Sequence, residues 1–175
     1  MPTIAGEAVE HRVRVVDLNR EQAGQVYAGA QPIRAFAVDR PDMSDLILTR
    51  SVDATTGWRR GDLVLDVLPV QEFRGGTFGL YFELYNARPG ATYRIDIAIG
   101  EKSRGIFRER RSLRLSFDEP MPLGDAARVP ILKAVQAELP PGTYVIRVTV
   151  ADQETGAELV REREVRVGAG GEGRG

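Results

Sequence analysis

Apolar and polar residues alternate along most of this chain, in short runs separated by glycine, proline and aspartate. Alternation with a period of two is typical of a β-strand, because successive side chains of a strand point to opposite faces. Residues 78–85 give the clearest example. One face of that run consists of Phe78, Leu80, Phe82 and Leu84, and the other consists of Tyr81, Glu83 and Tyr85. The sequence therefore predicts a strand whose first, apolar face lies in a core.

The same pattern predicts further strands along the chain, at residues 93–99, 113–117, 131–139, 144–150 and in a segment that ends at 165–167. An upstream edge strand is expected at 46–49 and 63–68, split by a loop that carries Trp58. Residues 89–99 resemble residues 141–150, because both enter a strand through a Pro-Gly turn and a tyrosine. No long helix is expected. About seven strands predict an all-β, immunoglobulin-like antiparallel β-sandwich.

Three regions are expected along the chain. Residues 1–43 form an N-terminal extension, whose strand-like pieces at 11–18 and 33–38 are expected to pack on the sandwich. Residues 44–167 form the sandwich itself. Residues 168–175 are rich in glycine, lack an apolar anchor and predict a flexible tail.

Composition narrows the function classes. The 175 residues are 42% hydrophobic and 28% charged, which suits one globular domain. The 24 Lys and Arg residues nearly balance the 25 Asp and Glu residues, so no strong positive field would attract nucleic acid or an anionic membrane. Membrane insertion is not expected either, because the sequence has no apolar run long enough to span a bilayer. The chain has no cysteine and one histidine, His11, which we interpret as an exposed strand residue. Disulfides, Cys-based metal sites and a Ser-His nucleophile are therefore disfavoured, and no cofactor or metal is expected.

Two clusters of charged residues each allow a structural and a functional interpretation. Asp39, Asp42 and Asp45 are expected to act as turn residues, with a Ca²⁺ loop as the alternative. Simple alternation places Arg108, Arg110 and Arg114 on one face, where they would discourage edge pairing between strands or, alternatively, contact a polyanion.

Aromatic residues supply the other candidate contacts. Trp58, Tyr81 and Tyr85 are interpreted as packing residues, with a platform for a sugar or a peptide as the alternative. A hydrolase would instead need paired carboxylates, such as Asp62 or Asp66 with Glu83.

Four segments carry a resemblance to a known family, at residues 44–48, 80–85, 139–144 and 152–156. Their order and spacing resemble the C-terminal β-sandwich region of bacterial GWxTD-domain and related exported proteins. The naming motif is absent, because Arg59 and Arg60 follow Gly57 and Trp58. The resemblance implies an immunoglobulin-like or fibronectin-III-like accessory domain without assigned catalytic residues. It implies a periplasmic or secreted location if the chain belongs to a longer exported protein, and a cytoplasmic one if Met1 is the natural start.

We therefore expect a non-catalytic accessory or protein-interaction module that contacts a protein partner or a neighbouring domain. The candidate contact residues are Trp58, Tyr81 and Tyr85 as anchors, with Arg108, Arg110 and Arg114 as a polar rim. The alternative is a carbohydrate-binding module that uses Trp58 and surface tyrosines.

Overall fold

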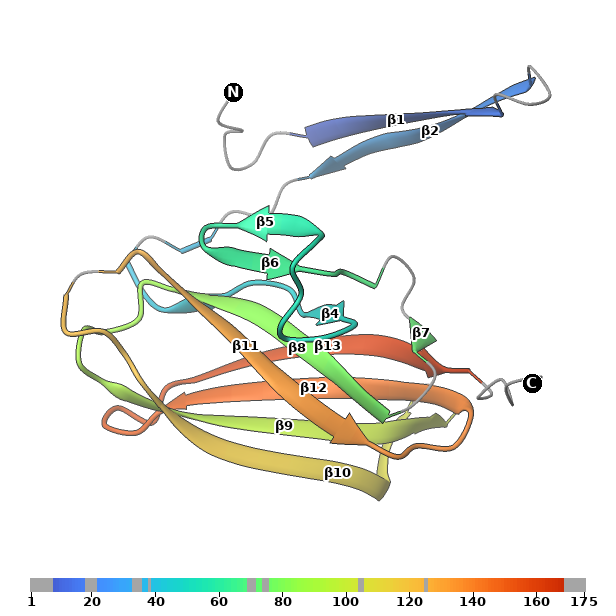
Figure 1. Ribbon diagram of the computed structural model, residues 1–175. Coiled ribbons are helices and arrows are strands. Elements are labelled where there is room, and N and C mark those ends of the chain that lie inside the picture. The colour runs from blue at the N-terminus through green and yellow to red at the C-terminus, as the bar shows by residue number, and fades with distance from the viewer. Residues whose placement is uncertain are drawn as a thin grey trace. The chain divides into compact units, whose positions relative to one another are not determined.

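The computed structural model describes residues 8–17, 22–32, 36–37, 39–68, 72–73, 76–103, 106–124 and 126–168. The chain divides into two compact units, Met1–Ala37 and Val38–Gly175. Every regular element within the described ranges is a strand, which confirms the expected all-β fold (Figure 1).

The first unit contains one antiparallel hairpin. Strand β1 (Ala8–Asp17) pairs with β2 (Gln22–Pro32), and the pairing shifts between Val9 and His11. The second expected strand, at 33–38, falls mostly outside the described residues. Of those residues the structure describes Phe36 and Ala37, which lie outside any strand. The sequence of β2 consists mainly of Gln, Ala and Gly and alternates only weakly between apolar and polar residues. This strand is therefore recognised by its pairing with β1 and not by its own sequence pattern.

The second unit contains the remaining strands. They are β3 (Asp42–Met43), β4 (Ile47–Thr49), β5 (Trp58–Arg60), β6 (Leu63–Leu65), β7 (Glu72–Phe73), β8 (Gly76–Tyr85), β9 (Thr92–Ser103), β10 (Ile106–Pro120), β11 (Arg128–Ala137), β12 (Gly142–Asp152) and β13 (Glu158–Val167). One sheet has the order β10-β9-β12-β13-β7, and the other has the order β11-β8-β3, with β4 also paired to β8. Strands β5 and β6 form a separate hairpin. The short β7 runs parallel to β13, whereas the other pairs are antiparallel.

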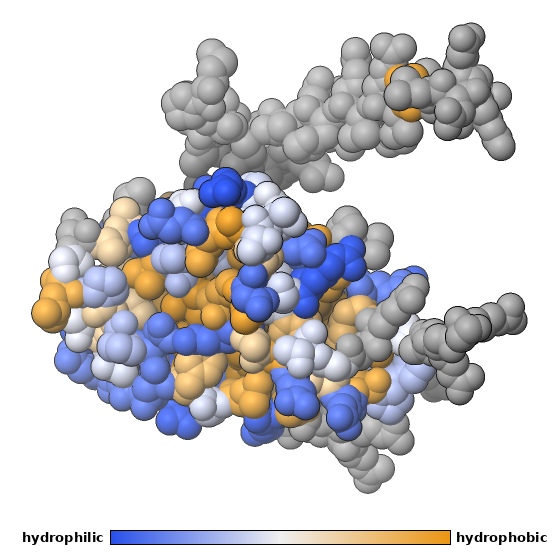
Figure 2. All heavy atoms as spheres, viewed as in Figure 1, coloured by the Kyte–Doolittle hydropathy of each residue, from blue (hydrophilic) through white to orange (hydrophobic). Residues whose placement is uncertain are grey.

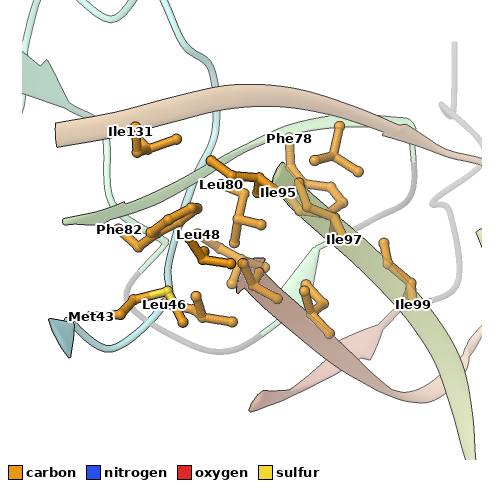
Figure 3. Close-up of a cluster of buried hydrophobic side chains, with 14 of the residues drawn as sticks. Met43, Leu46, Leu48, Phe78, Leu80, Phe82, Ile95, Ile97, Ile99 and Ile131 are labelled. Atoms are coloured by element: carbon orange, nitrogen blue, oxygen red, sulfur yellow. The ribbon is translucent and has the colours of Figure 1, made fainter. Parts of the chain in front are cut away.

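The core lies between the two larger sheets, as the alternation predicts. Strand β8 contributes Phe78, Leu80, Phe82 and Leu84, all of them buried, and β9 contributes Ile95, Ile97 and Ile99 (Figure 3). Strand β12 adds Tyr144, Ile146, Val148 and Val150. Removal of this apolar surface from water stabilises the two facing sheets.

Both tyrosines that follow a Pro-Gly turn fasten the turn to the strand. The Tyr144 hydroxyl donates to the Pro140 carbonyl at 3.0 Å, and the Arg88 backbone N–H donates to the Tyr93 hydroxyl at 3.2 Å. Pro140 and Arg88 each stand directly before the Pro-Gly pair. The repeated sequence pattern thus corresponds to a repeated way of closing a turn.

Two arginines close one side of the structure, between β13 and the β3–β4 segment. Arg161 and Arg163 have the same alternation parity as the buried Val165 and Val167, so they face inward from β13. Arg161 donates to the Met43 carbonyl and to the Asp42 carboxylate, at 2.9 and 2.7 Å. Arg163 donates to the Leu46 carbonyl. Inward-facing charges on an edge strand are a known protection against pairing with another chain.

Candidate functional site

The most unusual polar group of the second unit is the Glu83 side chain, which is 3% exposed. Glu83 lies on β8, on the face turned away from the apolar core. The same alternation places Tyr81 and Tyr85 on this face. A buried carboxylate requires partners, because removing a charge from water without compensation is costly.

Four side chains from three strands donate hydrogen bonds to the Glu83 carboxylate. Arg60 of β5 donates through Nε and Nη2, at 2.8 and 2.9 Å. Arg128 of β11 donates through Nη1 at 3.0 Å. The Tyr81 hydroxyl donates at 2.5 Å and the Tyr85 hydroxyl also donates. We call these five residues the Glu83 network.

The network fixes the protonation states of its members. Burial tends to raise the pKa of Glu83, but the hydrogen bonds from Arg60, Tyr81 and Tyr85 outweigh it and hold the pKa at about 2. Burial and the adjacent carboxylate raise the pKa of both tyrosines, and the hydrogen bond to Glu83 raises the pKa of Arg60. At neutral pH the site therefore contains a carboxylate, two guanidinium groups and two neutral phenols.

The β5–β6 hairpin lies over this face, on the side of the β11-β8-β3 sheet opposite the other large sheet (Figure 1). Its Leu65 is fully buried, as is Tyr81, yet neither belongs to the core cluster between the sheets. Gly57 precedes the hairpin with a φ of 140°. A Cβ at Gly57 would overlap the Leu65 backbone, so only glycine suits this close approach. The hairpin is thus held by Leu65, by the approach at Gly57 and by the bond from Arg60 to Glu83.

Trp58 is the large aromatic side chain that this hairpin presents to solvent, with 46% of its surface exposed. The Arg60 guanidinium lies 5.9 Å from the centroid of its ring, within the range of a cation–π contact. Arg59, between them, is exposed. The surface on this side of the molecule mixes apolar and strongly polar residues (Figure 2). One residue, Arg60, therefore links an exposed aromatic ring to a buried carboxylate.

The structure brings together three of the predicted contact residues in a way that alternation did not specify. Trp58 is exposed as a contact residue must be, and Tyr85 is half-buried in the Glu83 network. Tyr81 is 1% exposed, so the idea that it forms part of a surface platform is wrong. Its ring is covered and its hydroxyl is used by Glu83.

The three predicted rim arginines lie on β10, in the other sheet. Arg108 pairs with Glu101 and Arg114 pairs with Ala98, because the register shifts between Arg108 and Leu113. The single face expected for Arg108, Arg110 and Arg114 stays a prediction. The side chains of Arg108 and Arg110 lie outside the described residues, whereas Arg114 is exposed.

The acidic residues considered as Ca²⁺ ligands or as a hydrolytic pair are either bonded to arginines or exposed to solvent. Asp42 accepts a hydrogen bond from Arg161, and Asp66 lies 3.4 Å from Arg50 in an ion pair. Asp39, Asp45 and Asp62 are exposed. The described residues contain no group of three or more potential metal ligands. They also contain no helix of the length and hydropathy needed to cross a bilayer.

Sequence reasoning missed the Glu83 network, although part of the signal was present. The pattern Tyr-x-Glu-x-Tyr at residues 81–85 places a carboxylate between two phenols on one strand face. The two arginines come from β5 and β11, and only the tertiary fold brings them to this face.

Comparison with protein-family models and with curated proteins finds no match for this chain. Evidence for its function therefore comes from the geometry of the Glu83 network and of Trp58.

Proposed function

We propose that this chain is a non-catalytic protein-interaction module whose contact surface centres on Trp58. The observation that carries the proposal is the position of Trp58. Its exposed aromatic ring lies on a short hairpin, and Arg60 of that hairpin is hydrogen-bonded to the buried Glu83. Hairpins this short are not stable alone. Tryptophan and arginine are enriched among the residues that dominate binding energy, and a fixed ring loses little entropy when a partner binds.

The state of Glu83 supports a binding role over a catalytic one. A general acid or base needs a pKa near the working pH and access to substrate. Glu83 has a pKa of about 2, is almost fully buried and accepts hydrogen bonds from four side chains. Its geometry suits the anchoring of β5 to β8 and β11.

We further propose that the second unit is an immunoglobulin-like sandwich. In that fold strands C, F and G share a sheet that C′ extends, and A, B and E share the other. Assigning β8 as B, β9 as C, β10 as C′, β11 as E, β12 as F and β13 as G reproduces the orders β10-β9-β12-β13 and β11-β8-β3. Tyr144, at the start of β12, bonds to an upstream carbonyl as the tyrosine corner of strand F does. Such sandwiches commonly serve as accessory domains, and the resemblance to exported bacterial proteins agrees with that role.

Selection from a random-peptide display library tests the proposed function. We expect peptides that bind the full chain and the Leu123→Ala variant but not the Trp58→Ala variant. Leu123 is the matched control, because it is a large apolar residue that is 92% exposed elsewhere. Failure to obtain any peptide that depends on Trp58 would contradict the proposal.

A glycan array probed with the same three proteins tests the carbohydrate-binding alternative. Glycan binding that is lost in Trp58→Ala alone would replace the protein-interaction role with a carbohydrate-binding one. Absence of such binding, together with Trp58-dependent peptides, would support the protein partner.

A further inference from the structure

The Glu83 network contains more positive than negative charge. Arg60 and Arg128 both pair with Glu83, and neither has another carboxylate partner in the described part of the chain. Two guanidinium groups thus share one carboxylate. Arg59 is also exposed, but alternation along β5 places it on the face opposite Trp58 and Arg60. The surface beside the exposed ring is therefore locally positive, although the whole chain carries a net charge of -1.

Nearby acidic residues do not cancel this excess. Asp62 lies in the hairpin turn and forms no ion pair with Arg60 or Arg128 in the described part of the chain. Asp66 follows β6 and is engaged by Arg50. The positive charge beside Trp58 is accordingly available to a partner.

Hydrogen-bond donors remain on both guanidinium groups. Arg60 uses Nε and Nη2 for Glu83, which leaves Nη1, and Arg128 uses Nη1, which leaves Nη2. The Arg60 and Arg128 side chains are 39% and 33% exposed, so these donors can be reached from solvent. Nη2 of Arg128 lies beside the hairpin turn, where it would contact a Cβ at Gly61.

We propose that the surface formed by Trp58, Arg60 and Arg128 binds an acidic segment of a partner protein. This proposal rests on the proposed function and specifies the chemistry of its partner. A carboxylate accepts the remaining guanidinium donors, while an apolar side chain next to it packs on the Trp58 ring. The small local excess of charge matches one or two carboxylates, whereas a nucleic acid would need a row of phosphate contacts.

Synthetic peptides test the chemistry directly, since Trp58 is the sole tryptophan of the chain and its fluorescence reports on this surface. The probe is a peptide without tryptophan in which aspartate alternates with phenylalanine between glycine ends. The comparison peptide has asparagine in place of aspartate. We expect the aspartate peptide to change Trp58 emission saturably, to bind about tenfold more tightly than the asparagine peptide, and to weaken as salt is added.

Variants of the chain assign the effect to particular arginines. Arg128→Gln leaves the two hydrogen bonds from Arg60 to Glu83 intact. We expect this variant to bind the aspartate peptide about tenfold more weakly than the unmodified chain does. Arg59→Gln removes a charge on the opposite face of β5 and should leave peptide binding unchanged. Arg94→Gln is the matched control, because Arg94 is half-exposed on β9 of the other sheet, near Asp96 and Asp118. It should leave peptide binding unchanged.

The outcomes separate this proposal from the one on which it rests. Equal binding of the aspartate and asparagine peptides, or equal binding by Arg128→Gln and the unmodified chain, would overturn the acidic partner. If the display selection yields Trp58-dependent peptides that are basic or neutral, the protein-interaction role stands and the acidic partner is refuted. If no peptide depends on Trp58, both proposals fail together.

Discussion

Arg88 donates two hydrogen bonds to the carboxylate of Asp152, from Nε at 2.9 Å and from Nη2 at 3.0 Å. The two residues belong to different turns, one between β8 and β9 and the other after β12. Asp152 also accepts the backbone N–H groups of Glu154 and Thr155, at 2.9 and 3.2 Å. The same carboxylate thus shapes its own turn and fastens it to a second turn. The bond from Arg88 outweighs burial and holds the pKa of Asp152 well below its usual range.

The lowered pKa values of Glu83 and Asp152 predict acid sensitivity. A carboxyl group whose pKa is lower in the folded than in the unfolded chain stabilises the fold above its unfolded pKa, and this contribution is lost as pH falls towards the folded pKa. For Glu83, with a pKa of about 2 against an ordinary 4.5, it is about 3 kcal/mol. We expect the free energy of unfolding to stay level from neutral pH to about pH 5 and to fall between about pH 4.5 and 2.

Urea titrations at a series of pH values measure this dependence. Glu83→Gln should reduce the loss at acid pH, whereas Glu162→Gln, at an exposed pair with Arg147, should retain it. An acid dependence that is unchanged in Glu83→Gln would show that other carboxyl groups cause it.

Loss of Arg60 should release the β5–β6 hairpin without unfolding the core. In Arg60→Gln the Glu83 carboxylate keeps Arg128 and both tyrosines, but β5 loses its two bonds to β8. We expect a red shift of Trp58 emission, faster amide exchange over residues 58–65 and a loss of about 1–3 kcal/mol. Arg59→Gln is the adjacent control and should leave both signals unchanged. Coincident exchange across the hairpin and the core in Arg60→Gln would argue against local release.

Gly57→Ala should also destabilise the hairpin, for a steric reason. The residue has a φ of 140°, and a Cβ there would overlap the carbonyl of Leu65. We expect a loss of about 2 kcal/mol or more in a thermal melt, accompanied by the same shift of Trp58 emission. Gly124→Ala is the control, because an added Cβ has open space there. Equal melting temperatures for the two variants would contradict the close approach of Gly57 to Leu65.

The two inward arginines of β13 should respond oppositely to replacement by methionine. Arg161→Met removes the hydrogen bonds to the Asp42 carboxylate and to the Met43 carbonyl and should lower the melting temperature. Arg163 has a buried Nε without a hydrogen-bond partner, and burial lowers its pKa. Arg163→Met removes a buried, incompletely satisfied charge and should leave stability unchanged or raise it by about 1 kcal/mol. Thermal denaturation of both variants measures this difference. A lower melting temperature for Arg163→Met than for Arg161→Met would refute the expected opposite responses.

Alternation predicted the apolar face of β8 and the core strands β9 and β12, because burial on one face of a strand imposes a period of two. It did not predict the neighbours of Glu83, since Arg60 and Arg128 reach that residue from distant parts of the sequence. It also did not predict the register shift between Arg108 and Leu113 of β10. The same limit explains Tyr81, which lies on the non-core face but is buried and donates to Glu83.

The parallel pairing of β7 with the end of β13 has a mechanical consequence. Residues Arg166 and Val167 pair with Glu72 and Phe73, and β13 also pairs along its length with β12. A force that pulls β13 along its own axis must therefore slide it past both neighbours, so that many backbone hydrogen bonds resist together rather than open one by one. The inward Arg161 and Arg163 add cross-links to the opposite sheet in the same strand. Strand β13 should therefore resist being drawn out along its axis more strongly than being peeled from one end.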